Sequence, residues 1–433
     1  MMRRLFLFLW CLTSISLTSC GQNSSEVSPM TGEDSIGACN AVRKAHQMTD
    51  LPIYPLRTLY AHKNKTYEAG VEEKGLIYSS TKEINTSVGQ DVSFHTFMTA
   101  LHNPRSLLYT ERIDLPPYHG KNCRAYYGTV CSGLVTYALG FKITQRSADI
   151  PVADYMELVN DQSATGVRIA DVLWKKGHVM LVTAVEYKPN GRIGKIEYCE
   201  SVNPGARRVV VENGKAFNKL LKDRKLKIYR YKELYKNTDY KPLNEFVAVD
   251  GEQKVPFVYN DDICTSKGDK ACYITGEKVV LNVFGKSKQV EIYKDSTLLM
   301  VKDVNKDQNV VLDGLPYGDY KARAVNGKKK SDFTYWKVID VNVKVDRKNN
   351  RIYFSSANAK PVYYEFSSIR GGRPTNKNRI YAAEFTKKQI KNGFVTVKPP
   401  KRPEKKRKGI TYVKVHFGCD YGMVINKPVN WFE

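Results

Sequence analysis

The apolar positions in the first half of the chain predict one short helix followed by two antiparallel strands. Between residues 126 and 141, the apolar residues from Leu134 to Leu139 recur at the helical period, and Gly140 is a typical C-terminal stop. The run 174–187 is rich in β-branched residues, which predicts a strand. A turn signal at Asn190-Gly191 then predicts a return strand over 195–202 that lies antiparallel to the first.

The second half of the chain has another pattern, in which apolar and polar residues alternate over short segments. Turns rich in Gly, Asp and Asn separate these segments, as in all-β domains. The predicted strands cover 278–284, 289–293, 309–312, 315–325, 351–354, 361–366, 394–397 and 411–417. The proline turn that leads into Tyr320 is typical of immunoglobulin-like sandwiches. The pattern therefore predicts two all-β immunoglobulin-like sandwich domains, over 250–340 and 341–433.

The N-terminal segment has the pattern of an export signal. Arg3 and Arg4 precede an apolar run, and small residues follow it. Leu17-Thr-Ser-Cys20 resembles a bacterial lipobox, which implies cleavage before Cys20 and lipidation of its thiol; the alternative is an ordinary signal peptide with an incidental cysteine. Residues 21–38 are small and polar, which predicts a flexible tether. We therefore expect an exported protein, lipid-anchored in a bacterial cell envelope at the outer membrane.

The chain is strongly basic, with a net charge of +25 and its densest run of cations at 398–408. Inside a cell such a charge would suggest a nucleic-acid partner. The export signal and the lack of a nucleic-acid fold signature argue against that partner. Envelope polymers are anionic and suit a basic surface instead, whereas the oligomeric state is not predicted.

The nine cysteines divide by their expected roles. Cys11 leaves with the signal, Cys20 would carry the lipid, and Cys264 and Cys272 flank a short turn and could form a disulfide. The pairing of Cys39, Cys123, Cys199 and Cys419 stays open. The sequence has no CxxC pair and no HExxH motif, so we expect neither a structural zinc site nor a zinc protease, and no cofactor.

Cys131 is the candidate nucleophile, because it lies in or just before the first turn of the predicted helix. The unsatisfied N–H groups and the helix dipole stabilise a thiolate there, and the small Ser132 leaves the sulfur accessible. The alternative is a buried cysteine that packs as a small hydrophobe.

His178 is the candidate base, at the start of the predicted strand and directly after Gly177. The hairpin returns Glu200 and Asn203 to its side, and either could accept the second imidazole N–H and orient the ring. The alternatives are a surface histidine and a solvated strand end. Three other histidines lack this context and are weaker candidate bases: His95, His102 and His119.

The segment Val130-Cys-Ser-Gly-Leu-Val135, followed by Gly177-His178-Val179, resembles the NlpC-type cell-wall cysteine peptidases. This resemblance implies an α+β papain-like (NlpC-type) catalytic domain over 39–245. It also implies that Cys131 is the nucleophile and His178 the general base in the hydrolysis of peptidoglycan stem peptides of the γ-D-glutamyl–diaminopimelate type. The residues that it implies on the substrate side are Tyr126 or Tyr127, which precede the cysteine box and could assist the oxyanion site, Ser132, and the cleft-lining Tyr78 and Ser79.

The chain departs from this family at two points, which bear on the bond that is cleaved. Val130 replaces the usual aspartate, and a second histidine is missing from the third catalytic position. The end of the return strand, with Glu200 and Asn203, is closer to the related CHAP amidases. Two alternatives therefore stay open: a CHAP-like amidase or acyltransferase with another substrate, and a catalytically inactive surface lipoprotein that binds glycan or protein.

Overall fold

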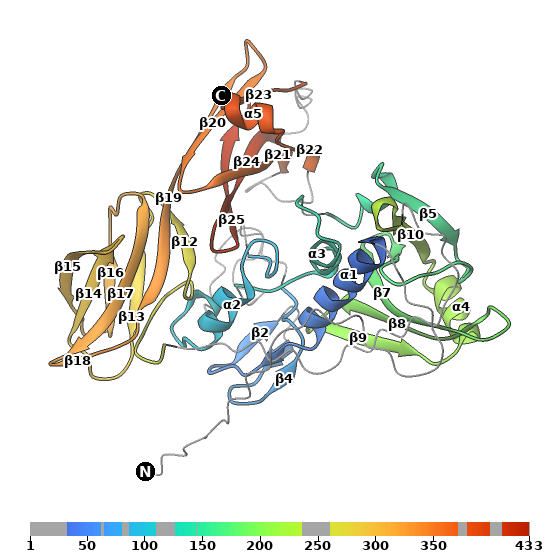
Figure 1. Cartoon of the computed structure of the whole chain (residues 1–433), viewed down its shortest axis with the longest axis horizontal. Coiled ribbons are helices and arrows are strands. Elements are labelled where there is room, and N and C mark those ends of the chain that lie inside the picture. The colour runs from blue at the N-terminus through green and yellow to red at the C-terminus, as the bar shows by residue number, and fades with distance from the viewer. Residues whose placement is uncertain are drawn as a thin grey trace.

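The computed structural model describes residues 33–61, 65–79, 86–109, 126–143, 145–235, 260–370, 379–398 and 409–432. Its N-terminal part, residues 33–235, is built on a six-stranded antiparallel sheet in the order β5-β10-β6-β7-β8-β9 (Figure 1). The strands are β5 Met156–Asp161, β6 Val172–Lys175, β7 His178–Tyr187, β8 Ile193–Ser201, β9 Ala206–Val211 and β10 Lys227–Tyr231.

Two helices, α1 Glu33–Thr49 and α3 Cys131–Ala138, pack against each other and against β7 and β8 (Figure 1). Their buried apolar residues and the almost fully buried β7 form the core of this part. The remaining elements are α2 Phe94–Leu101, α4 Gly214–Asp223, the 3-10 turns η2 Leu107–Tyr109, η3 Ile150–Val152 and η4 Lys232–Tyr235, and the short strands β1 Pro52–Ile53, β2 Leu59–Ala61, β3 Lys65–Tyr67 and β4 Glu73–Lys74.

Between residues 260 and 432, all the described secondary-structure elements except the short helix α5 are strands. They form three sheets. The smallest has the order β11-β13-β16, and a four-stranded sheet has the order β22-β21-β24-β25. The longest has the order β15-β14-β17-β19-β20-β23, and in it β12 also pairs with β19 and β18 with β17. The bounds are β11 Ile263–Thr265, β12 Ala271–Ile274, β13 Val279–Val283, β14 Gln289–Lys294, β15 Thr297–Asp303, β16 Asn309–Leu312, β17 Gly318–Asn326, β18 Lys329–Lys330, β19 Thr334–Asp346, β20 Arg351–Ala357, β21 Lys360–Arg370, β22 Arg379–Glu384, α5 Lys387–Asn392, β23 Phe394–Thr396, β24 Gly409–Cys419 and β25 Met423–Asn430. We call residues 260–340 the first β-unit and 341–432 the second.

The two β-units are joined by one strand and one covalent bond. The 13-residue strand β19 pairs with β17 in the first unit and with β20 in the second, so it runs through position 340 without a break. A disulfide links Cys272 of the first unit to Cys419 of the second. The expected pair of Cys264 with Cys272 is therefore wrong, and Cys264 is a buried free thiol.

The predicted fold class is wrong. About 46% of the described residues are in strands and only 17% in helices, of which five are α-helices, which does not match a helical α+β papain-like domain followed by two separate immunoglobulin-like domains. The physical reason is that strands of both β-units share β19 in one extended sheet, and that most of the N-terminal core is also sheet.

Several individual elements agree with the sequence patterns. The helix that starts at Cys131, the hairpin of β7 and β8, and the strands β13, β14, β16, β17, β20, β21, β23 and β24 are confirmed. The expected tether over 21–38 differs, because α1 begins at Glu33. The export signal, Cys20, His119, Cys123 and residues 399–408 of the basic run lie outside the described residues. Within the part of the chain that is described, no helix is long and apolar enough to cross a membrane.

The first β-unit holds the segment that leads to Cys131. The Tyr127 hydroxyl donates a hydrogen bond to the Lys267 carbonyl at 3.0 Å. Close by, Asn103 donates to the carbonyl of Thr265, and His95 binds Asp269 at 2.8 Å. The start of α3 is therefore anchored from outside the N-terminal sheet.

Candidate active site

The backbone before Cys131 is held between two other segments of the chain. The Thr129 N–H donates to Ile77 O at 3.0 Å, and Thr129 O accepts from the Ser79 N–H at 3.1 Å and from the Ser201 hydroxyl at 3.2 Å. Gly128 makes this close approach possible, because an added Cβ would lie 2.5 Å from the Ser79 Cβ. Since Ser201 ends β8, these bonds fix α3 relative to the strand that carries Glu200.

Cys131 is the first residue of α3 and is half-buried. Val130 precedes it with extended backbone, so the N–H groups of the first helical turn have no carbonyl partner four residues earlier. These N–H groups and the helix dipole place positive potential beside the sulfur. The thiol lies close enough to the His178 imidazole to contribute to the raised pKa of that ring.

His178 begins β7 and is oriented by Glu200 from the neighbouring strand β8. His178 Nε2 lies 2.8 Å from Glu200 Oε2, and the Glu200 side chain is only 2% exposed. The other carboxylate oxygen, Oε1, accepts from Arg207 Nε at 3.0 Å and from Arg207 Nη2 at 2.7 Å. Because Glu200 occupies Nε2, the remaining ring nitrogen, Nδ1, is the one available to the Cys131 thiol.

The electrostatics of the site favour a charged His178–Glu200 pair. Burial opposes the charge on His178, but the interactions with the Cys131 and Glu200 side chains outweigh it and raise the pKa of His178 from 6.5 to about 9. Burial also disfavours the ionised form of Glu200, yet the hydrogen bonds from His178 and Arg207 bring its pKa below the usual value. The imidazole is therefore protonated and the carboxylate ionised at neutral pH.

A second histidine–glutamate–arginine set lies on the same strands. His46 Nε2 lies 2.9 Å from Glu197 Oε1, and Arg208 donates to Glu197 Oε2 at 2.9 and 3.1 Å. Cys199 is next to it but is fully buried, and burial raises the pKa of its thiol to about 12. Side chains alternate along a strand, so Glu197 and Cys199 point away from the face that carries Glu200. In this second set His46 and Glu197 are buried, Arg208 is partly exposed, and the neighbouring thiol is not reactive.

The structure separates the two candidates for the third catalytic residue. Glu200 contacts His178, whereas Asn203, which precedes a cis bond to Pro204, has a buried side-chain oxygen without a hydrogen-bond partner in the described residues. Of the other candidate bases, His95 is hydrogen-bonded to Asp269 of the first β-unit. His102 lines a cavity of about 70 Å³ that Asp269 also lines, and burial lowers its pKa. Neither shows a bond to Cys131.

The residues expected on the substrate side divide into two groups. Tyr127 is buried and bound to Lys267, and Ser79 is buried, so neither side chain is open to a substrate. Tyr78, Tyr126 and Ser132 are half-buried around the loop before Cys131. The Tyr78 N–H donates to the carbonyl of Pro204 at 2.7 Å, which ties the loop to the turn between β8 and β9.

Arg207 is a site residue that the sequence analysis missed. Glu200 and Arg207 are cross-strand partners in the β8–β9 pair. The Asn203-Pro204-Gly205 turn between them is visible in the sequence and would have given this register. In the described residues, no group of three or more His, Cys, Asp or Glu side chains is arranged to hold a metal ion.

No family model and no curated protein matches this chain. Among solved structures, it is similar to a DUF3823 family protein from Bacteroides ovatus (17% identity, 39% of this chain and 99% of that chain, TM-score 0.18). It is also similar to the fibronectin(III)-like modules of Clostridium thermocellum CbhA (14% identity, 39% and 91%, TM-score 0.17) and to the CD2-binding domain of CD58 (8% identity, 37% and 96%, TM-score 0.18). No activity is transferred from these proteins to this chain.

Proposed function

We propose that this chain is a cysteine peptidase of the bacterial cell envelope that hydrolyses amide bonds of peptidoglycan stem peptides. The observation that carries the proposal is that the Cys131 thiol, at the start of a helix, interacts with His178, whose other side is hydrogen-bonded to Glu200. A thiol, an imidazole and an orienting carboxylate in this order form an activated nucleophile. An inactive binding protein has no need for this series.

In the proposed reaction, the Cys131 thiolate attacks the amide carbonyl carbon. The tetrahedral intermediate collapses when the His178 imidazolium donates its proton to the leaving amine, and a thioester to Cys131 remains. The neutral imidazole then takes a proton from water, whose oxygen attacks the thioester and releases the acid and the thiol. Glu200 keeps the ring oriented through both steps.

The N–H groups at the start of α3 are the proposed oxyanion donors. They point out of the helix beside the sulfur and are oriented before the substrate binds. Tyr78 and Tyr126 are half-buried aromatic side chains of the segments before the helix and would contact the stem peptide.

The proposed location is supported by chemistry outside the site. The disulfide between Cys272 and Cys419 suits an oxidising compartment outside the cytoplasm. The N-terminal pattern that ends at Cys20 predicts export and lipid anchoring, and the net charge of +25 suits anionic wall polymers.

A CHAP-like amidase is the second candidate, and the His178–Glu200 contact favours it. That family resembles this chain in having a glutamate after the histidine strand. The mechanism is unchanged, but the amide that is cleaved joins the glycan to the first residue of the stem peptide.

Digestion of purified diaminopimelate-type peptidoglycan tests both candidates, with Cys131→Ala alongside. Mass spectrometry of the fragments identifies the bond. New ends within the stem peptide that vanish in the variant support the peptidase, and release of whole stems supports the amidase. No cleavage by the wild type would refute the proposed substrate.

A further inference from the structure

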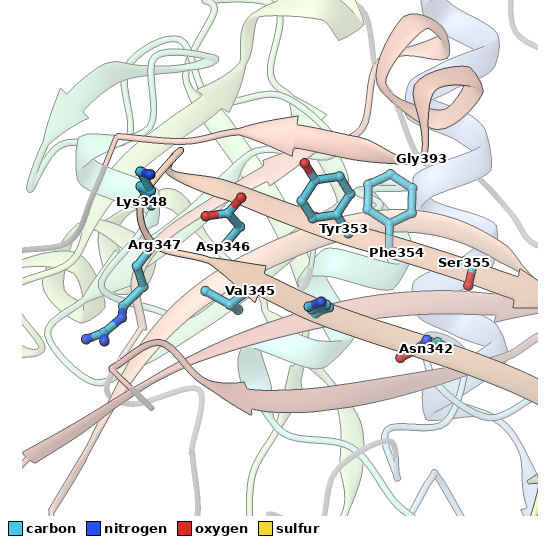
Figure 2. A pocket seen from close by; sticks show the side chains of 10 residues that line it. Asn342, Val345, Asp346, Arg347, Lys348, Tyr353, Phe354, Ser355 and Gly393 are labelled. Carbon is cyan, nitrogen blue, oxygen red and sulfur yellow. The ribbon is translucent and has the colours of Figure 1, made fainter.

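The second β-unit has a cavity of about 820 Å³ that the proposed reaction does not use. It is formed by the β19–β20 hairpin and by Gly393, which ends α5, and Figure 2 shows its lining residues. Its volume lies within the range of small-molecule sites, roughly 300–1,000 Å³. The six residues that carry the argument are Asn342, Lys344, Asp346, Arg347, Lys348 and Tyr353.

The register of the hairpin brings polar and aromatic side chains to one face. Asn342 pairs with Ser355, and Lys344 pairs with Tyr353. The intervening residues, such as Val343 and Ile352, are buried in the core. Since side chains alternate along a strand, the face opposite the core presents an amide, a hydroxyl, an ammonium and a phenol.

Three cations in the lining have no carboxylate partner. Lys344, Arg347 and Lys348 are exposed, and none of them forms an ion pair with a described residue. The one carboxylate of the lining, Asp346, already accepts hydrogen bonds from the Asn349 N–H at 3.1 Å and the Asn349 amide at 2.8 Å. The cavity is therefore positively charged and open to an anion.

In the sheet of the first β-unit, by contrast, cations are paired with a carboxylate. There, Glu291 lies between two cations, with Arg323 Nε at 2.8 Å and Lys330 Nζ at 2.8 Å. This surface of the first β-unit also has an aromatic side chain, as the cavity does, because Arg323 lies over the Tyr293 ring. What distinguishes the cavity is that no carboxylate of the described residues pairs with its cations; Arg347 Nη1 donates only to the Phe432 carbonyl, at 3.1 Å.

Tyr353 is the aromatic part of this surface. Its ring is half-buried, contacts Phe394 at 5.6 Å between centroids, and receives a hydrogen bond from Arg351 at 3.4 Å. Arg351 lies in turn over the Phe394 ring at 4.6 Å. These contacts hold the Tyr353 ring in place, so it offers a rigid apolar surface next to the cations.

We infer that this cavity binds an oligosaccharide that carries carboxylates. A sugar ring would lie on Tyr353, the hydroxyls would bind Asn342 and Ser355, and the carboxylates would bind Lys344, Arg347 and Lys348. A cavity of this size suits a few sugar units rather than the long basic groove that nucleic acids require. The site holds an acidic glycan of the envelope and is independent of cleavage at Cys131.

Isothermal titration calorimetry with the full chain tests this site. The probe is tetragalacturonate, with maltotetraose as the neutral probe and a single-stranded tetranucleotide as the nucleic-acid probe. We expect saturable binding of tetragalacturonate alone. We expect the triple variant Lys344→Gln/Arg347→Gln/Lys348→Gln to weaken it about tenfold or more, and Tyr353→Ala to weaken it about fivefold.

The matched control removes the same charge from exposed lysines of the first β-unit, as Lys286→Gln/Lys302→Gln/Lys306→Gln. Its affinity for tetragalacturonate should stay within about twofold of the wild type. Equal weakening in both triple variants would show that only net charge is sensed. That result, no binding of tetragalacturonate, or tighter binding of the tetranucleotide would each overturn the inference.

Discussion

Arg207 and its neighbour Arg208 offer a direct comparison of a site residue with a structural one. Each donates two hydrogen bonds to a glutamate of β8, which in turn binds a histidine. Only Glu200, the partner of Arg207, contacts the histidine that binds Cys131. We therefore predict that Arg207→Met lowers kcat and that Arg208→Met does not.

The size of the effect follows from the exposure of Arg207. A hydrogen bond to a charged group contributes about 1.5–3 kcal/mol when it is buried. The Arg207 side chain is 56% exposed, so solvent screening reduces its contribution to about 1 kcal/mol. If Glu200 is then less well oriented in the transition state, kcat falls about fivefold with little change in KM.

The pH dependence adds a second measurement. The pKa of Glu200 is lowered in the folded state, so its contribution to stability is present above its unfolded pKa of about 4.5 and is lost as the pH falls through the folded value. Arg207→Met moves that folded value back toward 4.5 and reduces this contribution at neutral pH.

The assay is steady-state hydrolysis of a soluble muropeptide, together with urea unfolding, for the wild type and both variants. Both variants should unfold more easily, by about 1 kcal/mol, since each loses bonds to a buried carboxylate. Equal loss of kcat in both variants, or an unchanged kcat in Arg207→Met, would refute the role of Arg207.

Three further predictions concern other parts of the molecule. Because His178 must be protonated to donate to the leaving amine, the rate of hydrolysis should fall as the pH rises through about 9. Glu200→Gln should shift this fall in rate to lower pH. A pH–rate profile that is the same in Glu200→Gln and the wild type would contradict the effect of Glu200 on the pKa of His178. Reduction of the disulfide between Cys272 and Cys419, or the substitution Cys419→Ser, should lower the free energy of unfolding by about 2–4 kcal/mol. Reductant should not lower the Tm of Cys419→Ser further. A wild-type Tm that is the same with and without reductant would contradict the stabilising role of the disulfide. Arg230→Met removes the two Arg230 donors, at 2.8 and 2.7 Å, from the buried Asp171 and leaves it the Arg168 N–H as a donor. This should cost about 3–5 kcal/mol in urea unfolding, part of which the double variant with Asp171→Asn should restore.

Local patterns predicted the elements around the candidate site. The helical period after Cys131 and the Asn190-Gly191 turn gave α3 and the β7–β8 hairpin, because short-range turn and propensity signals decide such elements. Glu200 was placed beside His178 by the same hairpin. Arg207 was missed because the turn at Asn203-Pro204-Gly205, which sets its pairing with Glu200, was not read as a hairpin into a third strand.

The larger arrangement was not available from local patterns. The partner of Cys272 lies 147 residues away, and the alternation of residues along β19 does not reveal that the strand serves two β-units. Tyr127 looked available to a substrate, but its hydroxyl binds a carbonyl of the first β-unit. These outcomes depend on long-range packing, which decides which side chains of a predicted element are buried.

The rate at which iodoacetamide alkylates Cys131, followed by mass spectrometry of the full chain at neutral pH, tests the central claim most directly. Cys199 and Cys264 are buried free thiols and serve as internal controls. The account predicts that Cys131 reacts much faster than these two and that His178→Ala slows it about tenfold or more, because the variant removes the imidazole that lies beside the sulfur. A Cys131 that reacts as slowly as the buried thiols, or at a rate that His178→Ala leaves unchanged, would contradict it.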